Sequence, residues 1–344
     1  MVTLKEIAKR TGVAESTISR ILNRDPTLSI SDEKRRRVVE TAEALQYVMR
    51  RSRSNRKEDA SIALRRPSDL KSVMIVHFLS SASELSQPFY VGLRQGIEAR
   101  CEAYGMATTR LFAGEFDPAM LNRARNVGVI SVGDLPAGQL EAIRSLGVPI
   151  VLAHPDEKPV DVDVVYVDLE AASARLCEWL LTRGIRRPAL VGAKDATSRR
   201  LAAFRSVMSA AGIFDPDYVS YGNDVTADGQ AHIRELVTRL SRAGKPLPDA
   251  VVIYADRTAV EVYRGLEEAK LSIPRDVQVV AFNDSSIARM LAPKLSTLRL
   301  EAGVIGETSV DLLMERHGGR KAAKHVQIMP TIIERGSTRK PQAS

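Results

Sequence analysis

The pattern of apolar positions near the N-terminus predicts two short helices joined by a tight turn. Residues 4–11 place apolar side chains three and four positions apart, and residues 15–22 do the same, so each segment has one apolar helical face. Gly12 can end the first helix at positive φ without a steric penalty. The apolar positions are Leu4, Ile7, Ala8, Ile18, Ile21 and Leu22.

A third helix is predicted over residues 31–47, where Ser31 can cap the start. Thr3 and Glu6 have the spacing of a capping box, in which the hydroxyl and the carboxylate satisfy free amides of the first helix. The turn alone would also fit a helical hairpin inside a bundle. Three helices around a small apolar core, with basic residues outside, are instead typical of a DNA-binding headpiece. The apolar stripe of the third helix is Val38, Val39, Ala42 and Leu45.

The second helix carries the candidate base-reading residues. In a helix-turn-helix this helix enters the major groove and presents its N-terminal side chains to base edges. Here those side chains belong to Glu15, Ser16 and, one turn later, Arg20. Arginine can donate two hydrogen bonds to guanine, so we expect Arg20 to contribute to base specificity. Glu15 could accept from a cytosine amino group, or repel phosphate and so disfavour wrong sites.

Positive charge is concentrated in the same part of the chain. Residues 1–72 hold 17 Lys and Arg against 10 Asp and Glu, whereas the net charge of the whole chain is +8. A basic small domain on a nearly neutral larger one suits a protein whose small domain contacts phosphates. A merely solvated basic face would explain the charge but not its coincidence with the helix-turn-helix. Double-stranded DNA is therefore the expected partner.

From residue 73 the chain alternates short apolar runs with amphipathic helical stretches, which predicts doubly wound α/β lobes with buried parallel sheets. At 344 residues and 44% apolar composition, the chain can form an all-α headpiece and two lobes. The predicted strands are 73–78, 127–132, 148–152, 188–192, 250–254 and 277–282. The predicted helices are 89–103, 136–146, 171–182, 199–211, 229–243 and 258–270.

Together these segments resemble the LacI/GalR family of bacterial transcriptional regulators. The motifs that carry the resemblance are Thr3-Leu4, Ile7-Ala8, Gly12-Val13, Ser16-Thr17-Ile18-Ser19-Arg20, Leu22-Asn23, Leu45-Gln46-Tyr47, Pro88-Phe89-Tyr90, Val167-Asp168 and Phe282-Asn283-Asp284. The resemblance implies a homodimeric repressor of a carbohydrate-utilisation operon, whose two headpieces bind a palindromic operator. The DNA contacts expected on this basis are Thr3, Glu15, Ser16, Thr17, Ser19, Arg20, Asn23, Arg35 and Leu64.

The resemblance also implies the domain organisation. The expected parts are a helix-turn-helix headpiece at 1–47, a basic linker with a candidate hinge helix at 48–72, and an effector-binding and dimerisation domain at 73–341. Lobe one would comprise 73–166 plus 300–329, and lobe two 167–299 plus 330–341, as in periplasmic sugar-binding proteins. In such folds, ligands bind where the carboxyl ends of the strands of the two lobes face each other.

The linker departs from the family pattern. Family members place a hinge helix after the headpiece, with a leucine that wedges into the minor groove. Counting straight on from Tyr47, this leucine falls on Arg56. Either the hinge is lost, or an insertion has moved it to residues 58–66 with Leu64 as the wedge; Leu64 could also simply pack on the body. We favour the moved hinge, because residues 58–66 are compatible with a helix that ends at Pro67.

A sugar-like effector between the lobes is a further implication of the resemblance. Arg200 matches a family arginine that hydrogen-bonds sugar hydroxyls, although it could be one more surface arginine. Asn283 stands where the family usually has the first Asp of a pair, and it either binds a hydroxyl or caps the next helix. Tyr166 would offer its ring to a sugar, while Phe89 and Tyr90 line the cleft or just pack there. The expected effector contacts are Phe89, Tyr90, Tyr166, Arg200, Asp256 and Asn283.

Other changes leave the identity of the effector open. Ala255, Val132 and His154 stand at positions that are often polar or acidic in the family. A galactoside is the first expectation, and another saccharide or a phosphorylated sugar is the next.

The sequence shows no signature of catalysis. It contains no nucleophile elbow, P-loop, dinucleotide fingerprint or metal-ligand spacing, so we expect neither an enzyme nor a cofactor. Cys101 and Cys177 are expected to be buried thiols. The chain has no 18-residue apolar run and no signal-peptide core, which favours a cytoplasmic protein without a membrane segment. The alternative function is that of a non-regulatory cytoplasmic sugar-binding protein with the same two-lobed fold.

Overall fold

The computed structural model describes residues 4–22, 30–44, 70–112, 114–123, 126–193, 198–222 and 228–340. The chain forms two compact units that divide between Pro67 and Ser68. We call the described residues of the first unit the headpiece and those of the second the body. The two units are described separately.

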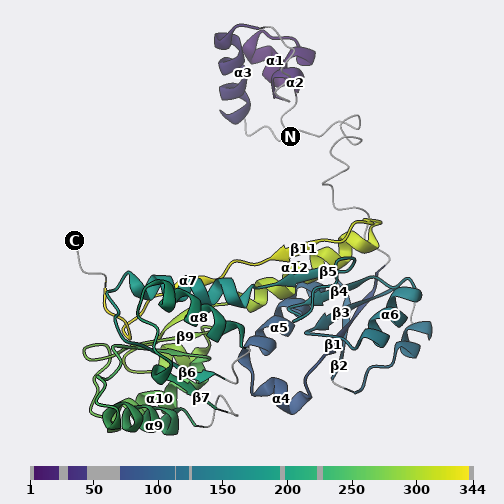
Figure 1. Cartoon of the computed structure of the whole chain (residues 1–344). Helices are drawn as coiled ribbons and strands as arrows, with labels where there is room; N and C mark the ends of the chain where they lie inside the picture. Colours follow the sequence, from purple (N-terminus) through teal and green to yellow (C-terminus); the bar gives the residue numbers. More distant parts are fainter. Residues whose placement is uncertain are drawn as a thin grey trace. The chain divides into compact units, whose positions relative to one another are not determined.

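The headpiece consists of α1 (Leu4–Thr11), α2 (Glu15–Leu22) and α3 (Asp32–Ala44) in its described residues, which confirms the predicted helix-turn-helix (Figure 1). Gly12 ends α1 with a φ of 69°, and its amide donates to the carbonyl of Ala8 at 2.9 Å. Arg37 of α3 donates to the carbonyl of Thr11 at 2.8 Å and so fixes the end of α1. The buried core is Ile7, Ile18, Ile21, Val38 and Ala42.

The body contains two α/β lobes, each built on one sheet (Figure 1). Its described helices are α4 (Ser81–Leu85), α5 (Pro88–Ala103), α6 (Ala137–Ser145), α7 (Leu169–Leu181), α8 (Arg199–Ala210), α9 (Gly229–Arg242), α10 (Asp256–Glu268), α11 (Ser286–Met290) and α12 (Ala302–His317), with 3₁₀ turns at Pro118–Arg123 and Pro216–Tyr218. Its described strands are β1 (Ser72–His77), β2 (Ala107–Leu111), β3 (Val127–Val132), β4 (Ile150–Ala153), β5 (Asp163–Tyr166), β6 (Pro188–Ala193), β7 (Val219–Tyr221), β8 (Ala250–Ile253), β9 (Gln278–Phe282), β10 (Ser296–Arg299), β11 (His325–Gln327) and β12 (Thr331–Ile333).

The sheet of lobe one has the order β11-β5-β4-β3-β1-β2, and its described neighbours all pair in parallel. Helices α5 and α12 cover one face, while α6 packs with the other face around Ile143. Because both faces are covered, every residue of β3 is buried, as its largely apolar sequence predicts. The backbones of α5 and α12 approach so closely that a Cβ at Gly96 would lie 2.2 Å from the carbonyl oxygen of Gly303.

The sheet of lobe two has the order β12-β10-β9-β8-β6-β7. Helices α7 and α8 lie over one face and α9 and α10 over the other, so this lobe is also doubly wound. One edge corrects the expectation of a fully parallel sheet, because β12 pairs antiparallel with β10. The chain enters β12 directly from β11 of lobe one, so β12 starts at the end of the sheet where its parallel neighbours finish.

The chain passes between the two sheets after β5, after β10 and after β11. We therefore propose that lobe one comprises 73–166 with 300–329 and lobe two 167–299 with 330–341. The carboxyl ends of the parallel strands of both sheets are where the loops of a ligand site are expected.

Candidate functional site

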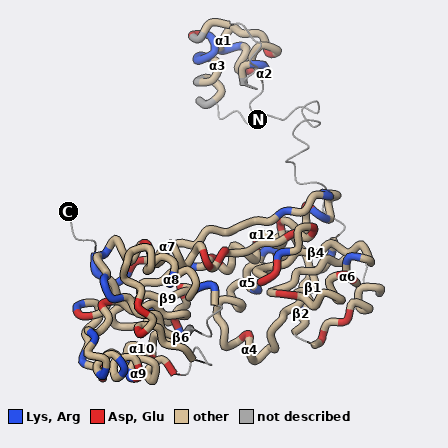
Figure 2. The backbone as a smooth tube through the Cα atoms, viewed as in Figure 1, with Lys and Arg blue, Asp and Glu red and all other residues tan. Residues whose placement is uncertain are grey.

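The surface of α2 in the headpiece is the first candidate site. Ile18 and Ile21 face the headpiece core, whereas Glu15, Ser16 and Arg20 are exposed. The structure therefore brings the predicted base-reading side chains onto the outward face of one helix. Thr17 is half-buried. Further basic residues of the headpiece lie on α1, where Lys9 and Arg10 are exposed, and at the start of α3 (Figure 2).

Some predicted DNA contacts cannot be placed. Thr3, Asn23 and Leu64 lie outside the described residues, as does the side chain of Ser19, so their roles stay predictions. The candidate hinge at 58–66 falls in the same category. Arg35 of α3 is half-buried.

A pocket of about 230 Å³ between the lobes is the second candidate site. It lies where the start of α5 and the loop after β4 in lobe one meet the starts of α8 and α10 and the loops after β8 and β9 in lobe two. This is the position expected for a ligand in paired doubly wound lobes. The lining residues are Gln87, Pro88, Phe89, Tyr90, His154, Leu169, Arg200, Tyr254, Ala255, Asp256, Arg257, Asn283, Ser285 and Leu300.

Arg200 is the most unusual group in this interlobe pocket. Its guanidinium donates to the carbonyl of Tyr254 at 2.5 Å and stacks 4.6 Å from the ring centroid of Phe282. Its buried Nε has no hydrogen-bond partner, and no carboxylate among the described residues pairs with the group. Burial lowers the pKa of this arginine, opposed by the nearby Tyr254 and Tyr90. A buried N–H of a charged group that no acceptor satisfies is costly, which indicates a ligand acceptor at this point.

His154 faces Arg200 from lobe one. Its Nδ1 lies 3.4 Å from the amide of Val167 and accepts its hydrogen, which leaves the proton on Nε2. Its ring centroid lies 4.9 Å from that of Phe89. Burial, together with the positive charge of Arg200, lowers the pKa of His154 to about 4. The imidazole is therefore a neutral hydrogen-bond donor at pH 7.

This pKa gives a pH-dependence that can be measured. The unfolded state, in which a histidine has a pKa of about 6.5, binds more protons between about pH 4 and 6.5, so stability rises with pH over this window. Asparagine tolerates the positive φ of 56° at this position. We expect His154→Asn to reduce the loss of unfolding free energy between pH 7.5 and pH 5 by about 2 kcal/mol. Urea unfolding of wild type and variant at the two pH values measures this loss. An equal loss in both proteins would contradict the lowered pKa of His154.

Asp256 was expected to contact the effector, but its carboxylate is already hydrogen-bonded within lobe two. Its two carboxylate oxygens accept from the hydroxyl of Thr297 at 2.7 Å and from the amide of Ser285 at 2.5 Å. Burial raises its pKa to about 6, although these hydrogen bonds oppose the rise. The carboxylate thus holds the loop after β9 in place.

Asn283 and Asp284, the two residues after β9, have different surroundings. Asn283 lines the pocket with a φ of 104°. The carboxylate of Asp284 is instead buried in lobe two, where it pairs with Arg299 at 2.6 Å and with Arg335 at 2.6 Å. Asn283 is therefore the member of the pair that can meet a ligand.

Two arginines of lobe two contact lobe one beside the pocket. Arg199, at the start of α8, donates to the carbonyl of Asp156 at 3.0 Å, and its guanidinium lies 3.5 Å from the carboxylate of the same residue. Arg257, at the start of α10, donates to the carbonyl of Ser86. These contacts depend on the arrangement of the lobes, so a ligand that changes that arrangement would make or break them.

The structure brings five of the six predicted effector contacts together, since Phe89, Tyr90, Arg200, Asp256 and Asn283 all line the pocket. Tyr166 does not line it. Side chains alternate along β5, so Tyr166 packs with Val164 on the face opposite Val165 and Val167, with the ammonium of Lys158 4.6 Å from its ring centroid.

Sequence reasoning missed several lining residues. Gln87, Tyr254, Arg257 and Ser285 come from segments whose sequence carries no ligand-binding pattern, and His154 was noted only as a departure. Their position at strand ends and helix starts is the signal that could have found them.

The remaining chemistry of the described residues is sparse. Cys101 and Cys177 are free and buried, as expected, and burial raises the pKa of each thiol to about 12. No group of three or more His, Cys, Asp and Glu side chains in the described part of the chain is arranged to hold a metal ion. No helix described here combines the length and apolarity needed to cross a membrane.

Comparison with known proteins matches both units. Residues 3–49 match the family described as bacterial regulatory proteins, lacI family, and residues 177–338 match the periplasmic binding protein-like domain. The HTH-type transcriptional regulator GalR of Lacticaseibacillus casei is 30% identical over 349 residues, which cover 98% of this chain and all of the relative. The lactose operon repressor of Rhizobium radiobacter is 50% identical over 97 residues, which cover 28% of this chain and 86% of the relative.

The fold is similarly matched among solved structures. The transcriptional regulator CelR in complex with cellobiose superposes with a TM-score of 0.65 at 24% identity, covering 98% of this chain and all of that structure. The similarity extends over headpiece and body alike.

Proposed function

The chain belongs to the LacI family of bacterial transcriptional regulators, and we propose that it represses a carbohydrate-utilisation operon under the control of a saccharide bound between its lobes. One observation carries the proposal: an outward helix face with Glu15, Ser16 and Arg20, and a pocket arginine that has no carboxylate partner, occur on two separate compact units of one chain. The helix face suits binding to DNA, and the pocket arginine suits a ligand rich in hydrogen-bond acceptors.

The DNA-binding form is a homodimer on a palindromic operator. Two headpieces related by a two-fold axis read two half-sites, so the symmetry of the protein is mirrored in the DNA. Arg20 reads a base, and the basic residues of α1 and α3 contact phosphates. The protein acts in the cytoplasm, where the DNA is, and catalyses no reaction.

The effector is a saccharide, with a galactoside as the first candidate. Arg200 and His154 donate to sugar oxygens, Asn283 both donates and accepts, and Phe89 and Tyr90 offer ring faces. The names of the relatives GalR and lactose operon repressor support this choice.

The lobe arrangement couples the two sites. A ligand that contacts both lobes favours the arrangement in which its contacts are complete, and the Arg199–Asp156 and Arg257–Ser86 contacts respond to that arrangement. The effector binds more tightly to one arrangement of the lobes than to another. This difference in binding free energy sets the largest change that the effector can make to operator affinity.

Arg20→Ala is expected to relax base specificity. Loss of a bidentate contact to guanine costs about 1–3 kcal/mol on the preferred operator and much less on other sequences. Selection of preferred sites from random DNA, with wild type and variant in parallel, measures the change. An unchanged preferred site would show that Arg20 does not read a base.

Arg35→Ala serves as the matched comparison. A phosphate contact carries no sequence information, so this variant should weaken binding to all sequences alike and reduce the dependence of affinity on salt. Gel retardation at several salt concentrations measures both effects, and it also tests the alternative function. Binding of saccharides without any binding to DNA upstream of the neighbouring gene would favour a non-regulatory sugar-binding protein.

A further inference from the structure

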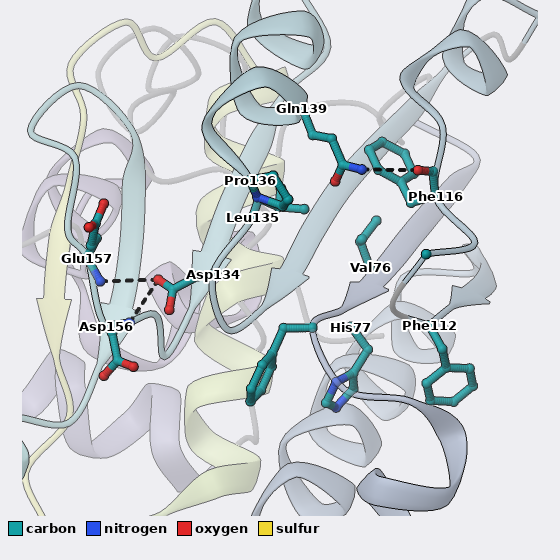
Figure 3. A pocket seen from close by; sticks show the side chains of 12 residues that line it. Val76, His77, Phe112, Phe116, Asp134, Leu135, Pro136, Gln139, Asp156 and Glu157 are labelled. Carbon is teal, nitrogen blue, oxygen red and sulfur yellow. Dashed lines mark hydrogen bonds between the residues drawn. The ribbon is translucent and has the colours of Figure 1, made fainter.

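Lobe one contains a second, larger pocket of about 540 Å³ that none of the roles described above uses. It lies at the carboxyl ends of β1, β2 and β3 and is closed on one side by the loop after β4 (Figure 3). Phe112 and Phe116 lie on one side of it, and Asp134 lies on the other, beside Asp156 and Glu157.

The walls of this pocket combine rings with hydrogen-bond acceptors. Its apolar lining includes Phe78, Phe112 and Phe116. One oxygen of Asp134 accepts from the amides of Asp156 and Glu157 at 3.0 and 3.1 Å, which leaves its other oxygen available.

Gln139 adds a further acceptor. Its amide nitrogen donates to the carbonyl of Phe116 at 3.2 Å, so the amide oxygen is left to accept (Figure 3). The described lining residues include no Lys or Arg.

A row of packed rings lies between this pocket and the interlobe pocket, which have no lining residue in common. Successive ring centroids along it are 4.9 to 5.9 Å apart. The row begins in the lobe-one pocket and ends beside Arg200, in the order Phe112, His77, Phe78, Tyr90, Phe89 and His154.

We propose that the lobe-one pocket is a second sugar subsite, and that the effector is a neutral glycoside of at least two units. This inference rests on the proposed function. One unit lies in the interlobe pocket against Arg200, and the next lies in lobe one beyond Phe78, which is 41% exposed and whose ring centroid is 5.1 Å from that of half-buried Tyr90. The interlobe pocket alone, at about 230 Å³, is smaller than typical ligand sites, which measure about 300–1,000 Å³.

The charge of the second subsite selects the class of ligand. Hydroxyl groups donate to the carboxylate and amide oxygens of Asp134 and Gln139, and ring faces take the apolar side of a sugar. A carboxylate or phosphate on the second unit would meet acidic side chains without a cation among the lining residues, so an acidic glycoside is disfavoured.

Titration calorimetry on the full-length protein tests the proposal with galactose, glucose, lactose, melibiose and cellobiose as probes. One disaccharide should bind at least about fivefold more tightly than the monosaccharide that matches its terminal unit, since one stacked ring contributes about 1 kcal/mol. Phe112→Ala and Gln139→Ala should each remove most of this gain and leave monosaccharide affinity unchanged. Retained monosaccharide binding shows that the variants are folded.

Leu146→Ala is the control, because Leu146 is 42% exposed on lobe one and lines neither pocket. It should leave both affinities unchanged. Equal affinities of wild type for every disaccharide and its monosaccharide, or an equal loss of both in Phe112→Ala, would overturn the second subsite while leaving the proposed function intact. Absence of binding by all five saccharides would overturn the proposed function itself, and the second subsite with it.

Discussion

Arg200→Gln is expected to abolish the response to effector while leaving operator binding intact. The guanidinium has no carboxylate partner and its Nε is buried without an acceptor, so it gives its remaining hydrogen bonds to the ligand. Hydrogen bonds from a charged group contribute about 1.5–3 kcal/mol each, and the loss of two lowers effector affinity by about a hundredfold or more. Calorimetry with the saccharide measures this loss. Fluorescence anisotropy on labelled operator checks that DNA binding without effector is unchanged.

Arg205→Gln is the matched control for this change. Arg205 lies on the same helix α8 but is exposed and faces Phe214, with its guanidinium 5.7 Å from the ring centroid. It should bind effector as wild type does. An Arg200→Gln protein that retains effector affinity would show that the interlobe pocket is not the effector site.

Ile18→Ala is expected to unfold the headpiece and so to abolish specific DNA binding. Ile18 is fully buried in a small core, and such a truncation costs about 2–5 kcal/mol. A headpiece of this size has a total stability of only a few kcal/mol, at about 0.05–0.15 kcal/mol per residue. Effector binding should be unchanged, because the body is a separate compact unit. Operator anisotropy and effector calorimetry on the same sample measure both effects.

Glu15→Ala provides the comparison on the same helix. Glu15 is exposed at the start of α2, so its removal leaves the headpiece folded and alters only contacts to DNA. Wild-type operator affinity in Ile18→Ala would contradict the assignment of this core to the DNA-binding unit.

The headpiece was the most predictable part of the chain. The apolar spacing of Ile7, Ile18 and Ile21 allows only one buried face per helix, and Gly12 marks the turn. Buried strands such as β3 were also predictable, because they are mostly apolar and flanked by helical periodicity.

The edges of the sheets were not predicted. Strand β2 at one edge is mostly exposed, so its sequence carries no apolar run, and β7, β11 and β12 have only three residues each. Their identity as strands depends on neighbours that are distant in the sequence. The antiparallel direction of β12 was not predictable either, because it follows from the chain entering lobe two directly from β11 of lobe one.

The candidate effector site was predicted in part. Resemblance pointed to Arg200 and Asn283, which line the interlobe pocket, and to Tyr166, which does not line it, because the face of a strand residue depends on register. The lobe-one pocket was missed altogether. Phe112, Asp134 and Gln139 come together only through the order of the strands, which local sequence does not specify.

The most direct test of coupling between the two units is the affinity of the full-length protein for its operator, measured by anisotropy with and without a saturating saccharide that calorimetry shows to bind. We expect the saccharide to change operator affinity by at least about fivefold, the lower end of typical coupling between sites, and Arg200→Gln to remove the change. An operator affinity that stays the same at saturation would contradict the regulation of the headpiece by the body.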